Sequence, residues 1–575
     1  LDLRDVLRLR LGRIELAREV ALLLVELLEE ARRDREEVTS RELRDLVPEA
    51  RIESIDAKDF VRAPDANGEL RPVVHPRGSF VFRLAGRERQ QSASYYTPEV
   101  LTRFTVGQAL EELLDQDDTT TTADEILELS VCEPAMGSGA FAIEAVRQLA
   151  EQYLKRKQEE LGERIDPENY AIELQRVKSY IALHNVYGVD LNATAVEFAE
   201  ITLWLDTMGP GLAAPWFGLH LRRGNSLIGA RHTVIPAGQV TERGYLEATP
   251  VEVPLTEGLA NHHNAVHHFL LPTSGWGSTV DAKEAKNIAP ETTAKLKDWR
   301  KTFRKKPTAA QVRRLRDLAI RTDVLWGFAL RRLQIAESEI RRAIPLWGRD
   351  FKPTGGAVSR EQIEESLADP NGAYRRLRRV MDAWCALWFW PLTDGDRTVD
   401  GEIVEPPTLD EWIDTLTDLL GTPVKETRNE KAGQGNLYDV STWSELTDAE
   451  ESDLLFAQAK AVDSALAAHP WLVVAERIAQ RQGFFHWELD FAPVFTRGGF
   501  DLQVGNPPWV RPRSDVDALL AEGDPWFQLA VKPTQAQLKE KRAAALALPG
   551  IDDLVLDGTA DIAATAAFLG DACLF

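Results

Sequence analysis

Cysteine, methionine and histidine are scarce in this sequence of 575 residues, which contains 3, 3 and 10 of them. Cys132, Cys385 and Cys573 are too scattered for a disulfide framework or a cysteine-based zinc site, which favours a reducing, cytoplasmic setting. Long apolar runs are also lacking. The apolar stretch 20–25 ends at Glu26, far short of the ~20 residues that cross a bilayer. These absences exclude a disulfide-rich secreted protein and a membrane-spanning one.

Acidic residues are in excess: 91 Asp and Glu against 68 Lys and Arg give a formal net charge of −23. Taken alone, this balance argues against a nucleic-acid partner, because binding a polyanion is driven largely by phosphate neutralisation. With 44% hydrophobic and 28% charged residues, the chain can bury a large core, and its length predicts two or more domains. It begins at Leu1 and ends at Phe575 within an apolar run, so we expect a piece of a longer protein.

The patterning of apolar residues divides the chain into four regions. Apolar positions at helical spacing over 1–37 predict a helical N-terminal region, 1–90. Region 91–230 alternates short β-rich runs with helical ones, which predicts an α/β fold with a parallel sheet. Region 231–480 is mostly helical and rich in Trp, as expected of a large insertion. The alternation returns in region 481–575.

Individual elements follow from the same patterns. We expect strands at 126–132, 185–190, 218–222 and 500–504. We expect helices near 140–160, 192–207 and 535–546, and a last one from about 560 to the end.

The first motif is the run 131–141 (VCEPAMGSGAF), placed where an apolar strand turns into a helix. Its small residues let backbone approach a ligand, and the helix start presents free N–H groups. A tight strand-to-helix turn is the plain alternative. The run matches neither GxGxxG nor GxxxxGK[ST], which favours a nucleotide-like ligand without a triphosphate.

The second motif, Tyr187 to Asn192 (YGVDLN), places Asp190 at the end of the next strand. A carboxylate there can accept hydrogen bonds from ribose hydroxyls. A helix N-cap is the alternative, and both roles can coexist.

The third motif is Asn506-Pro507-Pro508-Trp509, directly after a predicted strand. An Asn side-chain oxygen and a neighbouring Pro carbonyl are two rigidly held acceptors, suited to grip the two hydrogens of an exocyclic amino group. Trp509 can stack on a planar base. Alone, this tetrapeptide is more often a Pro-rich turn; after the other two motifs it indicates a catalytic site.

Together the motifs resemble those of the S-adenosylmethionine-dependent DNA N6-adenine methyltransferases of the γ arrangement, in which cofactor motifs precede the catalytic one. The resemblance covers the runs 95–98 (YYTP), 133–141, 187–192, 224–227 (GNSL) and 506–509. The insertion, with its runs 269–272 (FLLP) and 275–277 (GWG), is similar to that of the long methyltransferases of phage-defence systems of the DISARM and BREX (PglX) types. The resemblance implies a Rossmann-like class I methyltransferase sheet, and it implies a protein of the bacterial or archaeal cytoplasm. The implied partners are double-stranded DNA and, in a defence system, further subunits.

Carried over residue by residue, the resemblance implies a catalytic set and a cofactor set. The catalytic set is Asn506, Pro507, Pro508 and Trp509. The residues that would bind S-adenosylmethionine are Tyr96, Thr97, Pro98, Glu133, Pro134, Ala135, Gly137, Gly139, Asp190 and Asn225. The family commonly has Asp or Asn where Glu133 stands and often Asp where Asn225 stands, which puts the cofactor affinity in doubt. The 66 residues after Trp509 are too few for the family's remaining strands together with a target-recognition region.

The chemistry expected of this set is transfer of a methyl group to a flipped-out adenine, its amino nitrogen oriented by Asn506 and the Pro507 carbonyl. Cys132 lies outside any Pro-Cys motif, which argues against cytosine C5 chemistry. Two other functions stay open. One is a protein-glutamine N5-methyltransferase, whose motif is NPPY-like. The other is a cofactor-bound DNA-recognition subunit that is inactive without partners.

Three further signals are weaker. Residues 300–342 hold 13 basic and 4 acidic residues, so the DNA-binding candidates are Arg304, Lys305, Lys306, Arg313 and Arg314; a solvated helix face is equally expected. A second basic cluster spans 375–379. Residues 262–268 (HHNAVHH) could place His263 and His267 on one helix face, but we expect a polar surface segment and no metal site. Trp384, Trp388 and Trp390 are expected in the core of the insertion.

Overall fold

The computed structural model describes residues 62–64, 70–72 and 97–571, except 117–118, 213, 243–244, 263, 341–343, 351–357, 424–439, 441, 509–514 and 531. The chain forms two compact units. The first comprises Leu1–Leu84 and Ala521–Ile551, and the second comprises Ala85–Leu520 and Asp552–Phe575. The helix expected over 1–37 lies outside the described residues.

The described residues of the first unit form a short antiparallel pair and two helices. Strand β1 (Arg62–Pro64) pairs with β2 (Leu70–Pro72). Helix α25 (Trp526–Leu529) is followed by α26 (Gln535–Leu546), which confirms the helix expected at 535–546. A capping box between Thr534 and Gln537 starts α26.

A parallel sheet of four strands organises the second unit. Its strands are β3 (Val131–Glu133), β4 (Val186–Asp190), β5 (Leu221–Arg223) and β11 (Leu502–Gln503). Their order is β11-β3-β4-β5, and every neighbouring pair is parallel. The chain therefore moves outward from β3 on one side and places β11 on the other, which makes a topological switch point between β3 and β11. Ligands of open α/β sheets bind at such points, beyond the carboxyl ends of the strands.

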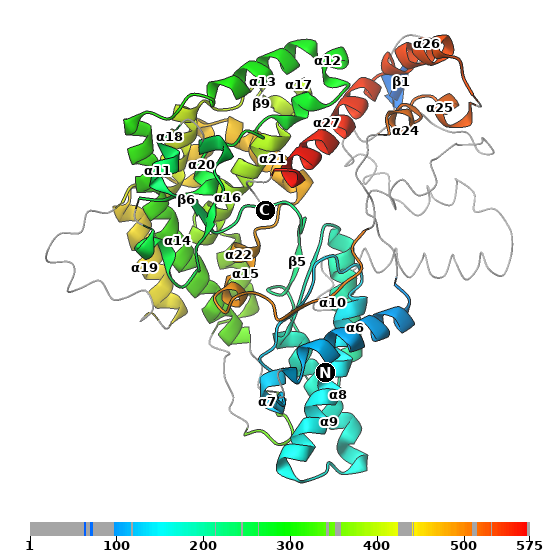
Figure 1. Cartoon of the computed structure of the whole chain (residues 1–575), viewed down its shortest axis with the longest axis vertical. Coiled ribbons are helices and arrows are strands. Elements are labelled where there is room, and N and C mark those ends of the chain that lie inside the picture. The colour runs from blue at the N-terminus through cyan, green and yellow to red at the C-terminus, as the bar shows by residue number, and fades with distance from the viewer. Residues whose placement is uncertain are drawn as a thin grey trace. The chain divides into compact units, whose positions relative to one another are not determined.

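Helices connect and cover these strands. They are α6 (Glu99–Leu113), α7 (Ala123–Ile126), α8 (Ala140–Leu161), α9 (Pro167–His184) and α10 (Ala193–Thr207). The α8 and α10 helices confirm those expected near 140–160 and 192–207. Figure 1 shows α6, α8, α9 and α10 gathered around the sheet. Helix α9 was not predicted, although Asp166 caps it and Pro167 occupies its first position, a common helix start.

The expected strand at 126–132 is wrong in its first half. Ile126 ends α7, because Thr122 and Glu125 form a capping box that commits 123–126 to a helical turn before the strand can begin. Strand β4 matches the expected 185–190 closely, and β5 and β11 lie within a few residues of the predicted runs.

Alternate residues of the strands face two different cores. Val131 and Val186 pack with residues of α8 and α9, whereas Cys132, Tyr187 and Val189 pack with Phe485, Phe491 and Val494. This period of two is the geometry of a strand buried on both faces. The second face ties the sheet to the segment 485–494, which leads into β11.

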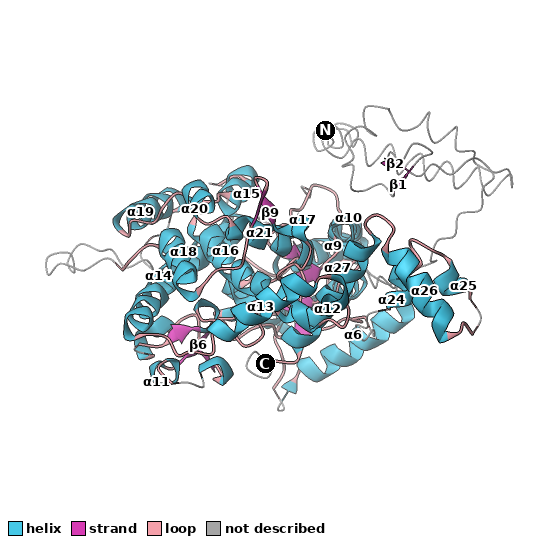
Figure 2. Ribbon diagram, turned by 90° about the horizontal axis from the view of Figure 1, so that it is seen from above, coloured by secondary structure: helices cyan, strands magenta, loops and turns pink. Residues whose placement is uncertain are grey.

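The connection from β5 to β11 is the largest part of the second unit, and most of it is helical (Figure 2). Its α-helices are α11 (Ala237–Val240), α12 (Ala285–Ile288), α13 (Pro290–Thr302), α14 (Ala309–Ile340), α15 (Arg360–Ala368), α16 (Ala373–Ala386), α17 (Asp394–Arg397), α18 (Leu409–Leu420), α19 (Trp443–Phe456), α20 (Val462–Ala468), α21 (Trp471–Gln482), α22 (Trp487–Asp490) and α23 (Ala492–Phe495). It also holds β6 (Thr233–Ile235), β7 (Val251–Glu252) and β8 (Val266–His267) in the order β7-β6-β8, and a hairpin of β9 (Thr398–Val399) and β10 (Glu402–Ile403).

Tryptophan side chains form much of the core of this connection. Trp384, Trp388 and Trp390 are buried, which confirms the expectation. The indole N–H of Trp384 donates to the Leu271 carbonyl, and that of Trp412 donates to the Leu270 carbonyl. The run 269–277 is thereby held inside the core.

Two helices close the described chain of this unit. They are α24 (Val516–Leu520) and α27 (Ile551–Leu569), which starts earlier than the helix expected from about 560. Leu556, Ala560 and Phe568 of α27 belong to the same core as the insertion. None of the described helices is long and apolar enough to cross a membrane.

Candidate functional site

Four parallel strands bring the sequence motifs to one edge of the sheet. The run 134–139 follows β3, Asp190 ends β4, Asn225 lies two residues beyond β5, and Asn506 lies three residues beyond β11. The carboxyl ends of neighbouring parallel strands share one edge. Residues that are hundreds of positions apart in the sequence therefore meet there.

Asp190 connects the second motif to the first. One carboxylate oxygen accepts a hydrogen bond from the Gly137 N–H at 2.8 Å, and the other accepts one from the Asn192 N–H at 2.8 Å. The Met136 N–H donates to the Val189 carbonyl at 3.1 Å, which holds the loop against β4. Asn192 caps α10 by accepting from Thr194, so the helix cap falls to Asn192 and leaves Asp190 to shape the loop.

Two glycines of the loop have conformations that other residues rarely adopt: Gly137 has φ of +54° and Gly139 has φ of +79°. A Cβ on Gly137 would meet nothing within 4 Å, so its Cα faces open space beside the Asp190 carboxylate. Gly188 on β4 has the opposite role. A Cβ there would lie 2.4 Å from the Met136 sulfur, so glycine is needed for the loop to pack on the strand.

Glu133 lies buried at the end of β3 and accepts a hydrogen bond from the Ala142 N–H in the first turn of α8, at 2.9 Å. Burial raises the pKa of Glu133 to about 8, although backbone N–H groups of α8 oppose the rise. The nearby Asp190 carboxylate raises it further. Glu133 thus fixes the loop from its helix side while Asp190 fixes it from its strand side.

Asn225 is half-buried, and its side-chain oxygen accepts from the Leu227 N–H at 3.1 Å. The preceding Gly224 N–H donates to the Asp190 carbonyl at 2.9 Å, which joins the third strand end to the second. Phe485 packs over Gly224, where a Cβ would lie 2.4 Å from its ring.

The side-chain amide of Asn506 donates to the hydroxyl of Thr97 at 3.3 Å. Thr97 is half-buried and lies just before α6, whereas Asn506 is exposed and lies after β11. Glu99 in the first turn of α6 contacts Arg147 of α8, which also binds Asp206 of α10 at 2.7 Å. Arg147 was not singled out from the sequence, yet it anchors α6, the helix that begins two residues after Thr97.

The remaining site residues from the sequence divide into two groups. Pro98, Pro134, Ala135, Pro507 and Pro508 are close neighbours of these residues in the sequence, and a Cβ on Gly505 would lie 3.6 Å from Glu133 and 3.7 Å from Pro134. Tyr96 and Trp509 lie outside the described residues.

The basic residues named as DNA-binding candidates belong to the helical connection. Arg304, Lys305 and Lys306 are exposed between α13 and α14, and Arg313 is exposed on α14. Arg314 pairs with Asp414 of α18 at 2.6 Å. Other basic residues of this stretch are used internally: buried Arg321 pairs with Asp453, and buried Arg332 pairs with Glu450. Part of the positive charge of 300–342 is thus unavailable to a partner.

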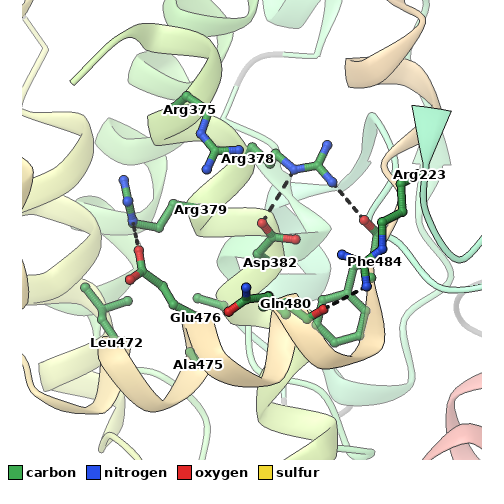
Figure 3. Close-up of a pocket in the computed structure, with 13 residues that line it drawn as sticks. Arg223, Arg375, Arg378, Arg379, Asp382, Leu472, Ala475, Glu476, Gln480 and Phe484 are labelled. Atoms are coloured by element: carbon green, nitrogen blue, oxygen red, sulfur yellow. Dashed lines mark hydrogen bonds and ion pairs between the residues drawn. The ribbon is translucent and has the colours of Figure 1, made fainter. Parts of the chain in front are cut away.

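A cavity of about 460 Å³ lies between α16 and α21, next to the end of β5 (Figure 3). Four arginines line it: Arg223, Arg375, Arg378 and Arg379. Arg379 binds Glu476, and Arg378 contacts Asp382 and the Phe484 carbonyl. Among the described residues, no ion-pair partner is found for Arg375. Arg223, whose role was not predicted, reaches from this cavity to the Leu191 carbonyl beside Asp190.

Cys132 and the second half of the histidine run 262–268 are both buried, and only for the histidine run does this contradict the expectation. The Cys132 thiol is buried between the sheet and Phe485, and burial raises its pKa. The expected polar surface segment at 262–268 is wrong for its second half, because Val266 to His268 are buried in β8 and the turn after it.

Two family models and one curated protein match parts of this chain. The model of the Eco57I restriction-modification methylase family matches residues 184–528, and that of the MmeI DNA-methyltransferase domain matches 110–209. A protein of Methanocaldococcus jannaschii, named as a type II restriction enzyme and methyltransferase, is 28% identical over 188 residues, covering 25% of this chain. The match spans only 15% of that relative's length. No solved structure matches.

Proposed function

The chain belongs to the Eco57I restriction-modification methylase family, and we propose that it transfers a methyl group from S-adenosylmethionine to N6 of adenine in DNA. The observation that carries the proposal is the meeting of Gly137, Asp190 and Asn506 at one edge of the parallel sheet. The reversal of strand order beside β3 supports a Rossmann-like class I methyltransferase sheet.

The residues at this edge fit the cofactor. Gly137 presents a bare Cα to open space, next to a carboxylate that retains lone pairs for ribose hydroxyls. Asn225 would lie toward the adenine end, and Thr97 and Pro98 toward the methionine end. When bound, S-adenosylmethionine supplies an electrophilic methyl group on a sulfonium.

Asn506 and Pro507 would receive the target amine. The side-chain amide nitrogen of Asn506 donates to Thr97, and its carbonyl oxygen would accept a hydrogen bond from the target amine. With the Pro507 carbonyl it would hold both amino hydrogens and direct the nitrogen lone pair toward the methyl group. Trp509 would stack on the flipped base. The buried, protonated thiol of Cys132 argues against cysteine-based cytosine chemistry.

Contacts to DNA would come from exposed basic groups of the helical connection. Arg304, Lys305, Lys306 and Arg313 are available for phosphate contacts, and Arg375 presents a further guanidinium in the arginine-lined cavity. We further propose that the modification marks host DNA as self in a restriction-modification or phage-defence system, as the family's name suggests.

The test is a transfer assay with S-adenosylmethionine labelled on its methyl group. The full chain is offered unmethylated duplex DNA in one arm and a glutamine-containing protein substrate in the other. We expect label in DNA only, and none with Asn506→Ala. Label in protein would replace the proposal by a glutamine methyltransferase. Cofactor binding without label in either arm would indicate a recognition subunit.

A further inference from the structure

Two buried histidines and a carboxylate converge in the helical connection, outside the methyltransferase site. They are His232, just before β6, His267 of β8, and Asp323 of α14. One nitrogen or oxygen of each lies within 4.8 Å of those of the other two. His232 and Asp323 were not singled out from the sequence. His267 was considered only as a partner of His263 on one helix face, where no metal site was expected.

The strand geometry explains why the two histidines meet. Strands β6 and β8 are antiparallel, with Val234 opposite His267. His232 is two residues before Val234, so its side chain emerges on the same face as those of Val234 and His267. His268 is the next residue along the chain and faces the other way, where its ring contacts the backbone of Arg231.

His232 has the orientation of a metal ligand. Its Nδ1 donates to the Val253 carbonyl at 2.8 Å, which leaves a lone pair on Nε2. That Nε2 faces an oxygen of Asp323 at 3.9 Å, too far for a hydrogen bond. A lone pair and a carboxylate repel each other at this distance, and a cation held between them would turn the repulsion into attraction.

His267 provides an independent observation. It is fully buried, and neither of its ring nitrogens has a hydrogen-bond partner. Buried polar atoms without a partner are rare, because each forfeits its hydration.

Asp323 supplies the charge and an opening to solvent. Its second oxygen accepts from the Leu259 N–H at 3.1 Å, the outer hydrogen bond typical of a ligating carboxylate. The side chain is 28% exposed, in contrast to 3% for His232, so an ion can enter from its side.

We propose that His232, His267 and Asp323 bind a divalent transition-metal ion, with Zn²⁺ as the preferred occupant and water as a further ligand. Two imidazoles and one carboxylate are a ligand set that zinc accepts. Bonds of about 2 Å can join donor atoms up to ~4 Å apart, so small side-chain rotations suffice. The ion would fasten the β7-β6-β8 sheet to α14 and take no part in methyl transfer.

The experiment uses the full chain, stripped with EDTA and dialysed, and titrated with ZnCl₂ in a calorimeter. We expect one ion per chain and a thermal midpoint that rises with zinc. His267→Gln and Asp323→Asn are each expected to weaken binding at least tenfold. Asp323→Asn keeps an acceptor for the Leu259 N–H, so its affinity for Zn²⁺ can be measured even if His267→Gln folds poorly.

His268→Gln is the matched control, because it removes a buried histidine of the same run that faces away from the cluster. It should bind Zn²⁺ as the wild type does. Titration with CoCl₂ should give visible d–d bands that disappear in Asp323→Asn. Absence of a 1:1 complex in the wild type, or wild-type affinity in both His267→Gln and Asp323→Asn, would overturn the proposal.

Discussion

The sheet and the helical connection of the second unit use charged residues in different ways. At the sheet edge, Asp190 binds backbone N–H groups and lies beside open space. In the connection, Asp490 is fully buried and bound by side chains from several elements: Arg222, Tyr374 and Arg378. The first arrangement leaves lone pairs for a ligand, and the second consumes them in packing. A count of charged residues in the sequence does not distinguish a ligand-accessible carboxylate such as Asp190 from a packed one such as Asp490.

The largest expected effect breaks the buried arrangement. Asp490→Ala would leave the guanidinium groups of Arg222 and Arg378 without their shared partner inside the protein. Burial alone would raise the pKa of Asp490, but these guanidinium groups hold it at about 2. We expect a loss of about 3–5 kcal/mol in the free energy of unfolding, measured by urea denaturation.

Asp414→Ala is the control for this variant, since Asp414 pairs with Arg314 where both side chains are largely exposed. It should cost less than about 1 kcal/mol. If the two variants lose equal free energy of unfolding, the buried Asp490 cluster stabilises the protein no more than the Asp414–Arg314 surface pair, which contradicts the prediction.

Glu133 predicts an effect of pH at the sheet. An unfolded Glu titrates near 4.5, whereas the pKa of folded Glu133 is about 8, so between these values the native state binds more protons. The free energy of unfolding therefore falls as pH rises from about 5 to 8, by a few kcal/mol. Glu133→Gln has no such proton to lose. Its unfolding should be flatter with pH, and parallel profiles for wild type and variant would contradict the prediction.

Asp190→Ala is expected to lower the affinity for S-adenosylmethionine tenfold to a hundredfold, about 1.4–2.8 kcal/mol, because it removes both a ribose acceptor and the anchor of Gly137. Isothermal calorimetry measures this. Asp501→Asn is the control: Asp501 accepts from Ser130 before β3 begins, at the opposite edge of the sheet. It should change stability and leave the affinity as it is.

Thr97→Ala gives the smallest effect. Loss of the hydrogen bond to Asn506 is worth about 1 kcal/mol, or roughly a fivefold lower rate of methyl transfer at saturating DNA and cofactor. Thr97→Ser keeps the hydroxyl and should restore the rate. If Ser and Ala variants are equally slow, the methyl group of Thr97 matters and the hydrogen bond does not.

Local patterns carried the prediction of the sheet and its edge. Strand β4, helices α8 and α10, and the buried tryptophans follow from apolar periodicity, and the Gly-rich loop and Asn506 follow from residue type. The contacts that unite them join Thr97 to Asn506 across 409 positions. Such contacts depend on topology, which periodicity does not report.

The histidine run 262–268 also shows that local spacing does not reveal which distant residues meet. Spacing paired His263 with His267, four residues apart, as on a helix. The segment instead forms a strand at His267, whose partner is His232, and the pairing of β6 with β8 decides this. Likewise, the basic run 300–342 indicates surface charge, but Arg321 and Arg332 are buried because α14 packs against α19, which holds Asp453 and Glu450.

Mass spectrometry of nucleosides from DNA treated with the full chain and S-adenosylmethionine is the decisive test of methyl transfer to adenine N6. We expect N6-methyladenine with the wild type. With Asn506→Ala we expect none above background, while calorimetry still shows cofactor binding. A different methylated nucleoside, or undiminished N6-methyladenine from Asn506→Ala, would overturn the proposed reaction.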